Sequence, residues 1–387
     1  MDFDLSDDQR QIKDSVDRML GAAYADLKTK VAAQKEPAGF STATWKQYAE
    51  LGLLGIPFAE ADGGLGAGPV ETMIVMEAIG RNAAIEPYLS TVVLGGGVLR
   101  HAGTAAQKAA LIGDVIEGKR RLALAHQERQ SRFDLADVQT KARSDGAGGY
   151  ILDGEKLVVL GGDSADTLIV VARVSGNRRD RAGLGLFLVG GTSAGVKRTG
   201  YATQDGGRAA DITFTDVKVG AKDVIVGTGG DGLAVLEQVV DEAISALASE
   251  AVGAMGAMHE LTVDYLKTRK QFGVAIGTFQ VLQHKSVDMF TALEQAKSMA
   301  YFGTMMVSEK TASERRKAMA AVKVQIGKSA KFVGETAIQL HGGIGMTMEY
   351  KAGHYFKRLT MIEMAFGNTE HFLRALAQGG GLIAAAA

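Results

Sequence analysis

The chain has 387 residues, which is enough to bury a large core in two or three structural layers. Its formal net charge of −1 gives no general attraction to nucleic acid or to an anionic membrane. The sequence has no cysteine, which excludes disulfides, thiolate metal sites and cysteine nucleophiles, and we expect no bound metal. The acidic start MDFDLSDDQRQIKDSV is unlike a signal peptide, and no apolar run reaches about 18 residues, so we expect a soluble cytoplasmic protein.

Residues 1–119 are predicted to form a helical domain. Apolar positions recur at helical spacing over residues 4–35, after an acidic first turn. Ser41 is predicted to cap a helix over 42–51. After the glycine-rich loop ADGGLGAG, Pro69 suits the first turn of a further helix.

Residues 120–225 are predicted to form a β-domain. Short alternating or β-branched runs, divided by Gly and Asp, replace the helical pattern there. Asp153 and Gly154 stand between two such runs in GYILDGEKLVVLG. This Asp-Gly pair predicts a hairpin turn.

Residues 226–387 are predicted to form a bundle of long antiparallel helices, because apolar residues again recur every three or four positions. The predicted buried stripes contain, in order of helix, Leu233, Leu236, Val240, Ile244, Leu247, Ala251, Met255 and Met258; then Phe279, Leu282, Ser286, Met289, Leu293, Ala296 and Ala300; then Val322, Ile326, Ala330, Val333, Ala337 and Leu340. The fold class is therefore mostly α with a central β-domain.

Two C-terminal stretches carry groups suited to holding a ligand. In QLHGGIG, Gly342 and Gly343 allow a backbone to approach a ligand closely, although a glycine cluster alone is more often a simple turn. In YLKTRKQFG, Arg269 and Lys270 stand at a predicted helix end. The helix dipole favours cations there even without a ligand.

Together these motifs resemble the acyl-CoA dehydrogenase family. RKQFG, the Phe-Gln pair at 279–280, Gln339 with its Gly-Gly pair, and Thr369 occur in the family's order. GLLGIPFAEADGGLG at 52–66 also resembles the family's N-terminal loop, so the resemblance covers essentially the whole chain. It implies an N-terminal helical domain, a middle β-barrel or sandwich and a C-terminal four-helix bundle, in a tetrameric protein.

The resemblance also implies a function. Family members use FAD to desaturate an acyl-CoA thioester between Cα and Cβ, usually passing electrons to electron-transferring flavoprotein. This chemistry needs a carboxylate base, donors to the thioester oxygen and a flavin that accepts hydride. The positions that match family contacts to FAD, including those offered to a neighbouring subunit, are Arg269, Gln271, Phe272, Gln280, Gln339, Gly342, Gly343 and Thr369.

The positions of the family's catalytic base depart from the pattern. Gly367 occupies the usual position and Ala243 the less common one, and neither residue accepts a proton. No catalytic residue is therefore predicted. Of the family's Asp-x-x-Arg element at the CoA arm, Asp241 is kept, but Ile244 replaces the arginine.

The flavin loop of the β-domain departs as well. It corresponds to QERQSRFD, in which Glu128 and Asp134 are kept and Phe133 replaces a serine. Val158 and Leu160 stand where the family presents a Trp and a Thr to the flavin ring. The half-site for the chain's own flavin is therefore predicted to be eroded, while the elements offered to a neighbour are intact.

Three interpretations remain open. The chain is a subunit without a base in an α2β2 enzyme, and PVETMIVMEA and HGGIGMTMEYKAGHYFKRL resemble small subunits of pimeloyl-CoA dehydrogenases, which act in dicarboxylate degradation. Alternatively it is a self-sufficient homotetramer in which Asp241, Glu242 or Glu370 serves as a displaced base. In the third interpretation it is a scaffold that kept the fold and lost the chemistry. The sequence does not identify the acyl group.

Overall fold

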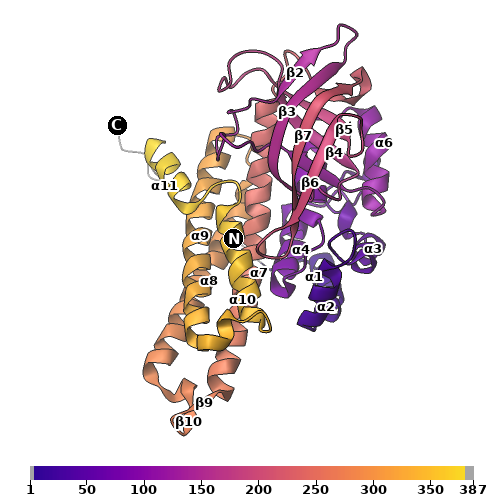
Figure 1. Ribbon diagram of the computed structural model, residues 1–387. Coiled ribbons are helices and arrows are strands. Elements are labelled where there is room, and N and C mark those ends of the chain that lie inside the picture. The colour runs from indigo at the N-terminus through magenta and orange to yellow at the C-terminus, as the bar shows by residue number, and fades with distance from the viewer. Residues whose placement is uncertain (1–3, 380–387) are drawn as a thin grey trace. The chain divides into compact units, whose positions relative to one another are not determined.

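The computed structural model describes residues 4–379 (Figure 1). The chain divides into two compact units, which we describe separately. Unit 1 comprises Met1–Ala32, Pro69–Ile85 and Ile244–Ala387, and unit 2 comprises Ala33–Gly68 and Glu86–Ala243. Within residues 4–379, no helix is both long and apolar enough to cross a membrane.

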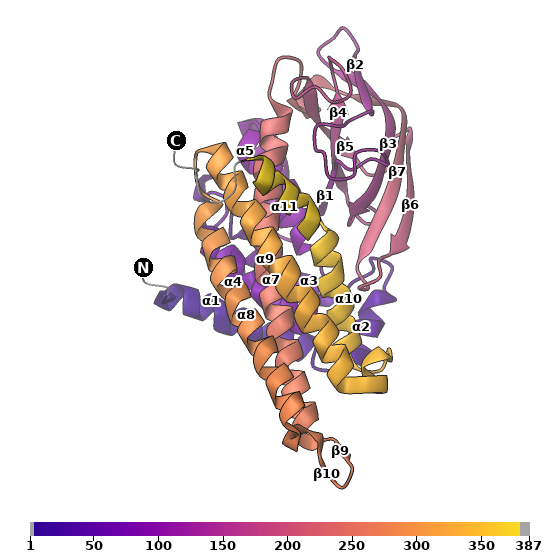
Figure 2. The ribbon, with the colours of Figure 1, turned by 90° about the vertical axis from the view of Figure 1, so that its left-hand side faces the viewer.

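Unit 1 is helical, and α9 is its central helix, because it packs against α8, α10 and α11 (Figure 2). A small hairpin of β9 and β10 follows α7, and the 3-10 segment η6 (Gly342–Met346) follows α9. The helices and strands that lie wholly or partly in unit 1 are α1 (Asp7–Ala23), α2 (Leu27–Gln34), α4 (Pro69–Asn82), α7 (Gly232–Thr268), β9 (Lys270–Gln271), β10 (Val274–Ala275), α8 (Gln280–Met306), α9 (Ala312–His341), α10 (Lys351–Met364) and α11 (Thr369–Gln378).

The predicted helix over 4–35 is two helices, α1 and α2. Ser6 caps α1 through a capping box with Gln9. The chain leaves the helix at Tyr24, and the Asp26 carboxylate then accepts a hydrogen bond from Lys28 N at 3.0 Å. Because an aspartate side chain competes with helical hydrogen bonds in this way, periodicity alone overestimates the helix length.

The predicted stripes of α7 and α9 are confirmed, since all their residues are at most 6% exposed. The stripe of α8 is confirmed only in its second half, where Met289, Leu293, Ala296 and Ala300 are buried. At its start Phe279 is 38% exposed, which contradicts the prediction. An apolar stripe therefore continues along α8 beyond the part that packs inside this chain.

Two glycines bring the backbones of α4 and α7 into contact within unit 1. A Cβ at Gly80 would overlap the carbonyl of Glu250, and a Cβ at Gly253 would overlap the carbonyl of Glu77. No other residue fits at these positions without moving a helix. The crossing joins parts of the chain that are distant in sequence.

Unit 2 contains short helices and the sheet. Ser41 caps α3, as predicted, by accepting from Thr44 N at 3.1 Å. Pro69 likewise begins α4 of unit 1, as predicted. Besides short 3-10 turns and the first part of α7, the helices of unit 2 are α3 (Thr42–Glu50), a π-helical segment η3 (Leu89–Gly95), α5 (Gly96–Ala102) and α6 (Ala105–Ile116).

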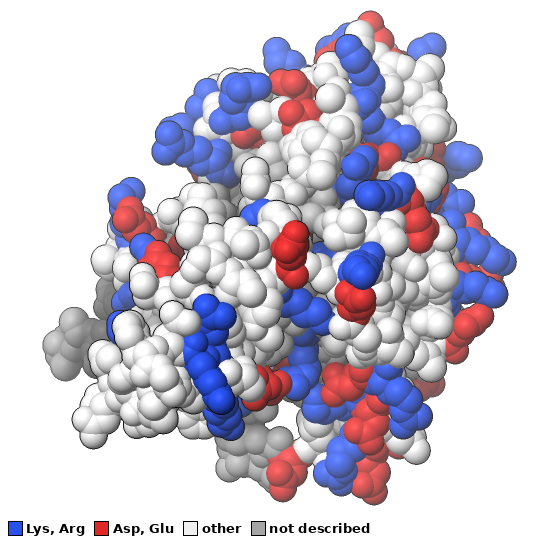
Figure 3. Space-filling view, turned by 60° about the horizontal axis from the view of Figure 1, so that its bottom comes forward, with Lys and Arg blue, Asp and Glu red and all other residues white. Residues whose placement is uncertain are grey.

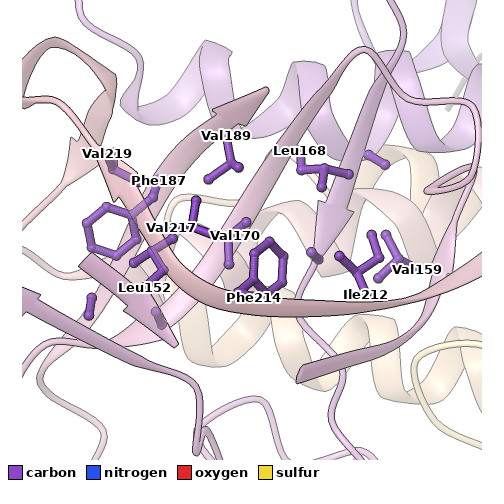
Figure 4. Packing of buried hydrophobic residues seen from close by; sticks show 14 of the residues in the cluster. Leu152, Val159, Leu168, Val170, Phe187, Val189, Ile212, Phe214, Val217 and Val219 are labelled. Atoms are coloured by element: carbon purple, nitrogen blue, oxygen red, sulfur yellow. The ribbon is translucent and has the colours of Figure 1, made fainter. Parts of the chain in front are cut away.

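One mixed, eight-stranded sheet forms the centre of unit 2, with the order β6-β7-β3-β2-β4-β5-β8 and β1 paired in parallel with β4. Its strands enclose an apolar core that includes Leu152, Val170, Phe187, Ile212 and Phe214 (Figure 4). The strands are β1 (Leu122–Ala125), β2 (Lys141–Ser144), β3 (Tyr150–Leu160), β4 (Thr167–Arg173), β5 (Leu184–Gly190), β6 (Val196–Ala202), β7 (Arg208–Val219) and β8 (Val224–Val226).

The hairpin predicted at Asp153 and Gly154 is wrong, because β3 runs through both residues. The register with β7 shifts between Leu152 and Gly154, so the pair forms a β-bulge. Gly154 has φ +150°, and a Cβ there would lie 2.6 Å from Thr140 Oγ1. Glycine is needed there for a bulge that crowds a neighbouring segment.

Candidate functional site

The first group of matched residues lies on an exposed hairpin after α7. Phe272 and Gly273 have φ +55° and +83°, as a two-residue type I′ turn requires. Phe272 is 91% exposed, and its ring meets that of Phe279 edge-on at 6.1 Å. Arg269 is exposed, and its guanidinium has no hydrogen bond or ion pair within residues 4–379. The hairpin therefore presents an unpaired cation beside an exposed aromatic ring.

The second group is the turn at the end of α9. Gly342 ends the helix with φ +60°. A Cβ at Gly342 or at Gly343 would meet no atom within 4 Å, so both glycines face open space. Gln339 is exposed one helical turn earlier. Backbone N–H groups at such a turn can approach a ligand directly.

These two groups are connected by a cluster of three rings in tilted contact that sequence reasoning missed. The ring of His341 lies 4.7 Å from that of Tyr265 and 5.1 Å from that of Tyr350. The Tyr265 carbonyl also accepts a hydrogen bond from Arg269 N at 2.8 Å. Tyr265 therefore links the Arg269 hairpin to the turn that begins at Gly342.

His341 is neutral in this ring cluster. Its side chain is 3% exposed, and its Nδ1 lies 2.8 Å from the carbonyl of Ala337. Burial lowers its pKa, although the carbonyls of Ala337 and Leu261 act to raise it. A single His between two Tyr positions at unrelated spacings gives no recognisable sequence signal.

The remaining matched glutamines are exposed on the hairpin and at the next helix. Gln271 donates through Nε2 to the carbonyl of Lys270 at 2.7 Å. Gln280 is exposed at the first turn of α8. Gln271 therefore lies on the Arg269 hairpin itself, and Gln280 follows directly after the 3-10 segment Ile276–Thr278.

Thr369 begins α11 after a tight turn. Its N–H donates to Glu363 Oε1 on α10 at 2.9 Å. Asn368 caps α11 by accepting from His371 N at 2.9 Å. The turn is thus held at both ends by carboxylate and amide side chains.

Gly367, at the family's usual base position, adopts a conformation that excludes a side chain. Its φ is +130°, which L-residues rarely adopt. A Cβ there would lie 2.6 Å from the ring of Phe372 and 2.9 Å from the ring of His371. The position lacks a carboxylate and also the space and backbone geometry for one.

The carboxylates near the base positions are engaged elsewhere or exposed. Glu242 pairs with Arg100 at 2.5 Å and with His101 at 2.6 Å. Burial acts to raise the pKa of Glu242, but His101 and Arg100 outweigh it and hold that pKa below its usual range. The Glu370 side chain is 76% exposed, beside Arg374. Asp241 is 5% exposed.

In the β-domain loop, the kept residue Glu128 has a structural role. It is 4% exposed and accepts from Lys156 Nζ at 2.7 Å, Thr140 N at 3.0 Å, and Gln139 N and Gln130 Nε2 at 2.7 Å each. Burial acts to raise its pKa, but Lys156 prevails and lowers the pKa to about 2. The Glu128 carboxylate, the strongest hydrogen-bond acceptor of the loop, is therefore satisfied by donors of the β-domain itself.

The strand positions expected beside a flavin ring carry aliphatic side chains. Val158 is 38% exposed at a second bulge of β3, with φ +51°, and its N–H donates to Asp211 Oδ1 at 3.0 Å. Leu160 ends the strand. Phe133 and Asp134 lie in the loop, where Asp134 Oδ1 accepts from Ala136 N at 3.0 Å. These side chains offer a flavin neither an indole nor a hydroxyl.

The two sets of residues fit FAD unequally. Arg269 and the open backbone at Gly342 and Gly343 suit an anionic group such as a pyrophosphate. Val158 and Leu160 supply no stacking ring and no hydrogen bond to a flavin ring. The matched residues of unit 1 therefore fit part of FAD, and the matched strand residues of the β-domain do not fit its flavin ring.

Three family models match the chain: the acyl-CoA dehydrogenase N-terminal domain over residues 6–119, the middle domain over 123–217 and the C-terminal domain over 230–380. Isovaleryl-CoA dehydrogenase of Pongo abelii is 30% identical over 95% of this chain and 87% of its own. A solved structure described as the Tcur3481–Tcur3483 steroid ACAD is 27% identical, with a TM-score of 0.85 over 96% of this chain and 97% of that one.

The fold and the cofactor agree with this assignment. A solved structure of PigA with FAD and proline has a TM-score of 0.86 at 25% identity, over 98% of this chain and 99% of that chain. The order of helices, sheet and helices predicted from the sequence is confirmed. The chain therefore belongs to the acyl-CoA dehydrogenase family of oxidoreductases, whose cofactor is FAD.

Proposed function

We propose that this chain is the subunit without a base in a heteromeric, FAD-dependent acyl-CoA dehydrogenase. The partner is a paralogue that holds the flavin and carries the glutamate. This chain lends Arg269, Gln271, Phe272, Gln280, Gln339, Gly342, Gly343 and Thr369 to that flavin. When bound, FAD supplies the acceptor for the hydride that leaves Cβ.

The geometry of Gly367 carries this proposal. A thioester leaves its α-proton only weakly acidic, so desaturation needs a positioned carboxylate. Gly367 combines φ +130° with two rings in van der Waals overlap of any Cβ, and Ala243 is fully buried. Both family positions are therefore without a proton acceptor.

The unpaired groups of unit 1 support the lending role. Arg269 has an exposed guanidinium, and a bidentate contact to a phosphate or carboxylate is what an arginine side chain favours. The backbone at Gly342 and Gly343 is open. A cation and open backbone N–H groups that have no anion within the described part of their own chain are expected where a neighbouring subunit supplies the anion.

Exposed apolar side chains at the start of α8 support a permanent neighbour. Val281 and Val287 are each 61% exposed, and Phe290 is 49% exposed. Exposed apolar patches of this kind mark subunit interfaces. On the face shown in Figure 3, Lys and Arg are interspersed with Asp and Glu. We assign the apolar side chains to the family-type contact with the partner subunit, in an α2β2 tetramer.

Several finer features belong to the same proposal. The three segments 1–119, 120–225 and 226–387 act as the N-terminal, middle and C-terminal domains. The substrate is an acyl-CoA thioester, the electron acceptor is electron-transferring flavoprotein, and the closest subtype is the pimeloyl-CoA dehydrogenase small subunit. The two-part designation of the steroid ACAD, which is similar to this chain, favours a partner as well.

The test is complementation. The chain purified alone is expected to be colourless, and the chain co-expressed with a glutamate-bearing paralogue should be yellow, with one FAD for each pair of chains. Flavin is quantified from its absorbance, and the assembly from its mass in solution. A homotetramer with one FAD per chain and turnover that depends on Asp241, Glu242 or Glu370 would instead establish a displaced base. A chain that stays colourless and inactive in both preparations would point to a scaffold.

A further inference from the structure

The terminal turn is held by a buried lysine that is not among the residues proposed to contact flavin. Lys323 lies in the middle of α9 with its side chain 3% exposed. Its Nζ donates to the carbonyl of Ile362 at 2.5 Å and to the carbonyl of Glu363 at 2.9 Å. These carbonyls belong to the last turn of α10, where no intrahelical N–H is available to them.

Glu363 connects Lys323 to Thr369 through two hydrogen bonds. Its carbonyl accepts from Lys323, and its side-chain Oε1 accepts from Thr369 N at 2.9 Å. A cation at a helix C-terminus is also favoured by the helix dipole. The position of Thr369 therefore depends on the end of α10, which Lys323 holds against α9.

The same helix leaves room for the threonine. Gly327 lies four residues after Lys323, so the two residues share one face of α9. A Cβ at Gly327 would overlap Thr369 Oγ1. One face of α9 thus carries a donor for the end of α10 and, one turn later, a gap for the Thr369 hydroxyl.

We infer that Lys323 and Gly327 are positioning residues that set where Thr369 lies in the terminal turn. The relevance of that position to flavin rests on the proposed lending function. Its geometry does not, and it can be measured on this chain without flavin. Burial lowers the pKa of Lys323 to about 7, although the Glu363 carboxylate acts to raise it. The strength of the hold should therefore vary within an accessible pH range.

Hydrogen exchange of the peptide over residues 366–372 tests the inference, with rates converted to protection factors at each pH. In the wild-type chain, protection should increase as the pH rises above about 7, because the buried amine is then neutral, whereas a lysine exposed by opening of the turn still binds a proton. Lys323→Met should lower protection at pH 8, where the neutral amine still donates to both carbonyls, by about tenfold and should remove this pH dependence. Lys328→Met, an exposed lysine on the same helix, serves as the matched control and should behave as wild type.

A second pair of variants keeps the test decisive if Lys323→Met fails to fold. Gly327→Ala should loosen the same peptide, even though alanine favours helix more than glycine does. Adding Thr369→Ala should restore the protection, because the hydroxyl that clashes is gone. The inference is overturned if residues 366–372 exchange alike in Gly327→Ala and wild type, or if Lys323→Met keeps the wild-type pH dependence. Neither result would bear on whether the chain needs a paralogue.

Discussion

The ligand-facing parts of the two units differ in how their polar groups are satisfied. Among the described residues of unit 1, the Arg269 guanidinium has no hydrogen-bond or ion-pair partner, and the backbone at Gly342 and Gly343 faces open space. In unit 2, the loop QERQSRFD matches the family's flavin loop, and its Glu128 carboxylate accepts hydrogen bonds from Lys156 and three other donors. A polar group whose hydrogen-bond partners lie within the protein has a structural role, whereas an exposed polar group without such partners is available to a ligand. The comparison explains why residues kept from the family pattern do not all keep a family function.

The largest expected effect tests the structural role of Glu128. Glu128→Gln leaves the fully buried Lys156 without its carboxylate, and removing one partner of a buried pair costs roughly 3–5 kcal/mol in unfolding free energy. Urea denaturation measures this loss. Glu128→Gln with Lys156→Met should recover much of it, and Asp134→Asn, at the other kept but exposed position, should cost little. An unchanged urea midpoint for Glu128→Gln would show that the loop is not built around this pair.

The pKa of Glu128 also fixes a direction with pH. Since the folded pKa is lowered to about 2, the stability from its ionisation is fully present above the unfolded value of about 4.3. That stability is lost as the pH falls from about 4.3 through 2. The difference in stability between wild type and Glu128→Gln should therefore shrink over this interval.

Gly367→Glu should have the next largest effect. A non-glycine residue at φ +130°, pressed against Phe372 and His371, is expected to cost about 3 kcal/mol, combining backbone strain with overpacking. The double variant Gly367→Glu with Phe372→Ala removes the nearer of the two rings and should recover the overpacking part of the loss, but not the backbone strain. Phe372→Ala alone is the control. Full stability of Gly367→Glu, measured by urea denaturation, would show that the turn can accept a base after all.

Arg269→Ala should have an effect on flavin affinity alone. Loss of a bidentate, charge-assisted contact costs on the order of 1.5–3 kcal/mol, or roughly ten- to a hundredfold in FAD affinity of the assembled protein. The thermal midpoint of this chain alone should stay the same, because Arg269 has no partner within residues 4–379. Arg374→Ala, at another exposed arginine, should not change flavin content. If both variants have the same FAD occupancy at limiting FAD, Arg269 does not contact the partner's flavin.

The smallest effect concerns His341. His341→Phe keeps an aromatic ring between Tyr265 and Tyr350 but loses the contact to Ala337, so we expect a cost of about 1 kcal/mol at pH 8. The folded pKa of His341 is lowered, so wild type loses stability as the pH falls below the unfolded value of about 6.5. The difference between the two proteins should therefore shrink under acid conditions. Thermal unfolding across pH measures it, and a constant difference would contradict a neutral, buried His341.

Periodicity and glycine positions predicted much of the fold and only part of the site. The stripes of α7 and α9 could be predicted because their partners lie within this chain. The exposed start of α8 could not, since periodicity shows that a face is apolar without showing what covers it. At Asp153 and Gly154 the sequence predicts a turn where the structure has a bulge, because both structures use the same residues.

The chemistry of the site was predictable where it depended on residue type alone. The absence of a carboxylate at Gly367 is visible in the sequence, but its φ of +130° is not. The packing of the His341 ring against Tyr265 and Tyr350 depends on tertiary contacts between α7, α9 and the start of α10. No spacing rule connects such positions, so the feature that links the Arg269 hairpin to the glycine turn emerged only from the structure.

The glycine crossing of α4 and α7 has a consequence for the order of folding. It joins residues near 80 to residues near 250, and the whole of 86–243, a continuous part of unit 2, lies between them in the chain. During synthesis, the long segment of unit 2 emerges before the second glycine is available, and domains fold as they emerge. Unit 1 must then close a loop of that size, which contributes to a slow step. Until it closes, the apolar faces of α1 and α4 await α7 and α8, and this interval is when the nascent chain is most exposed to aggregation.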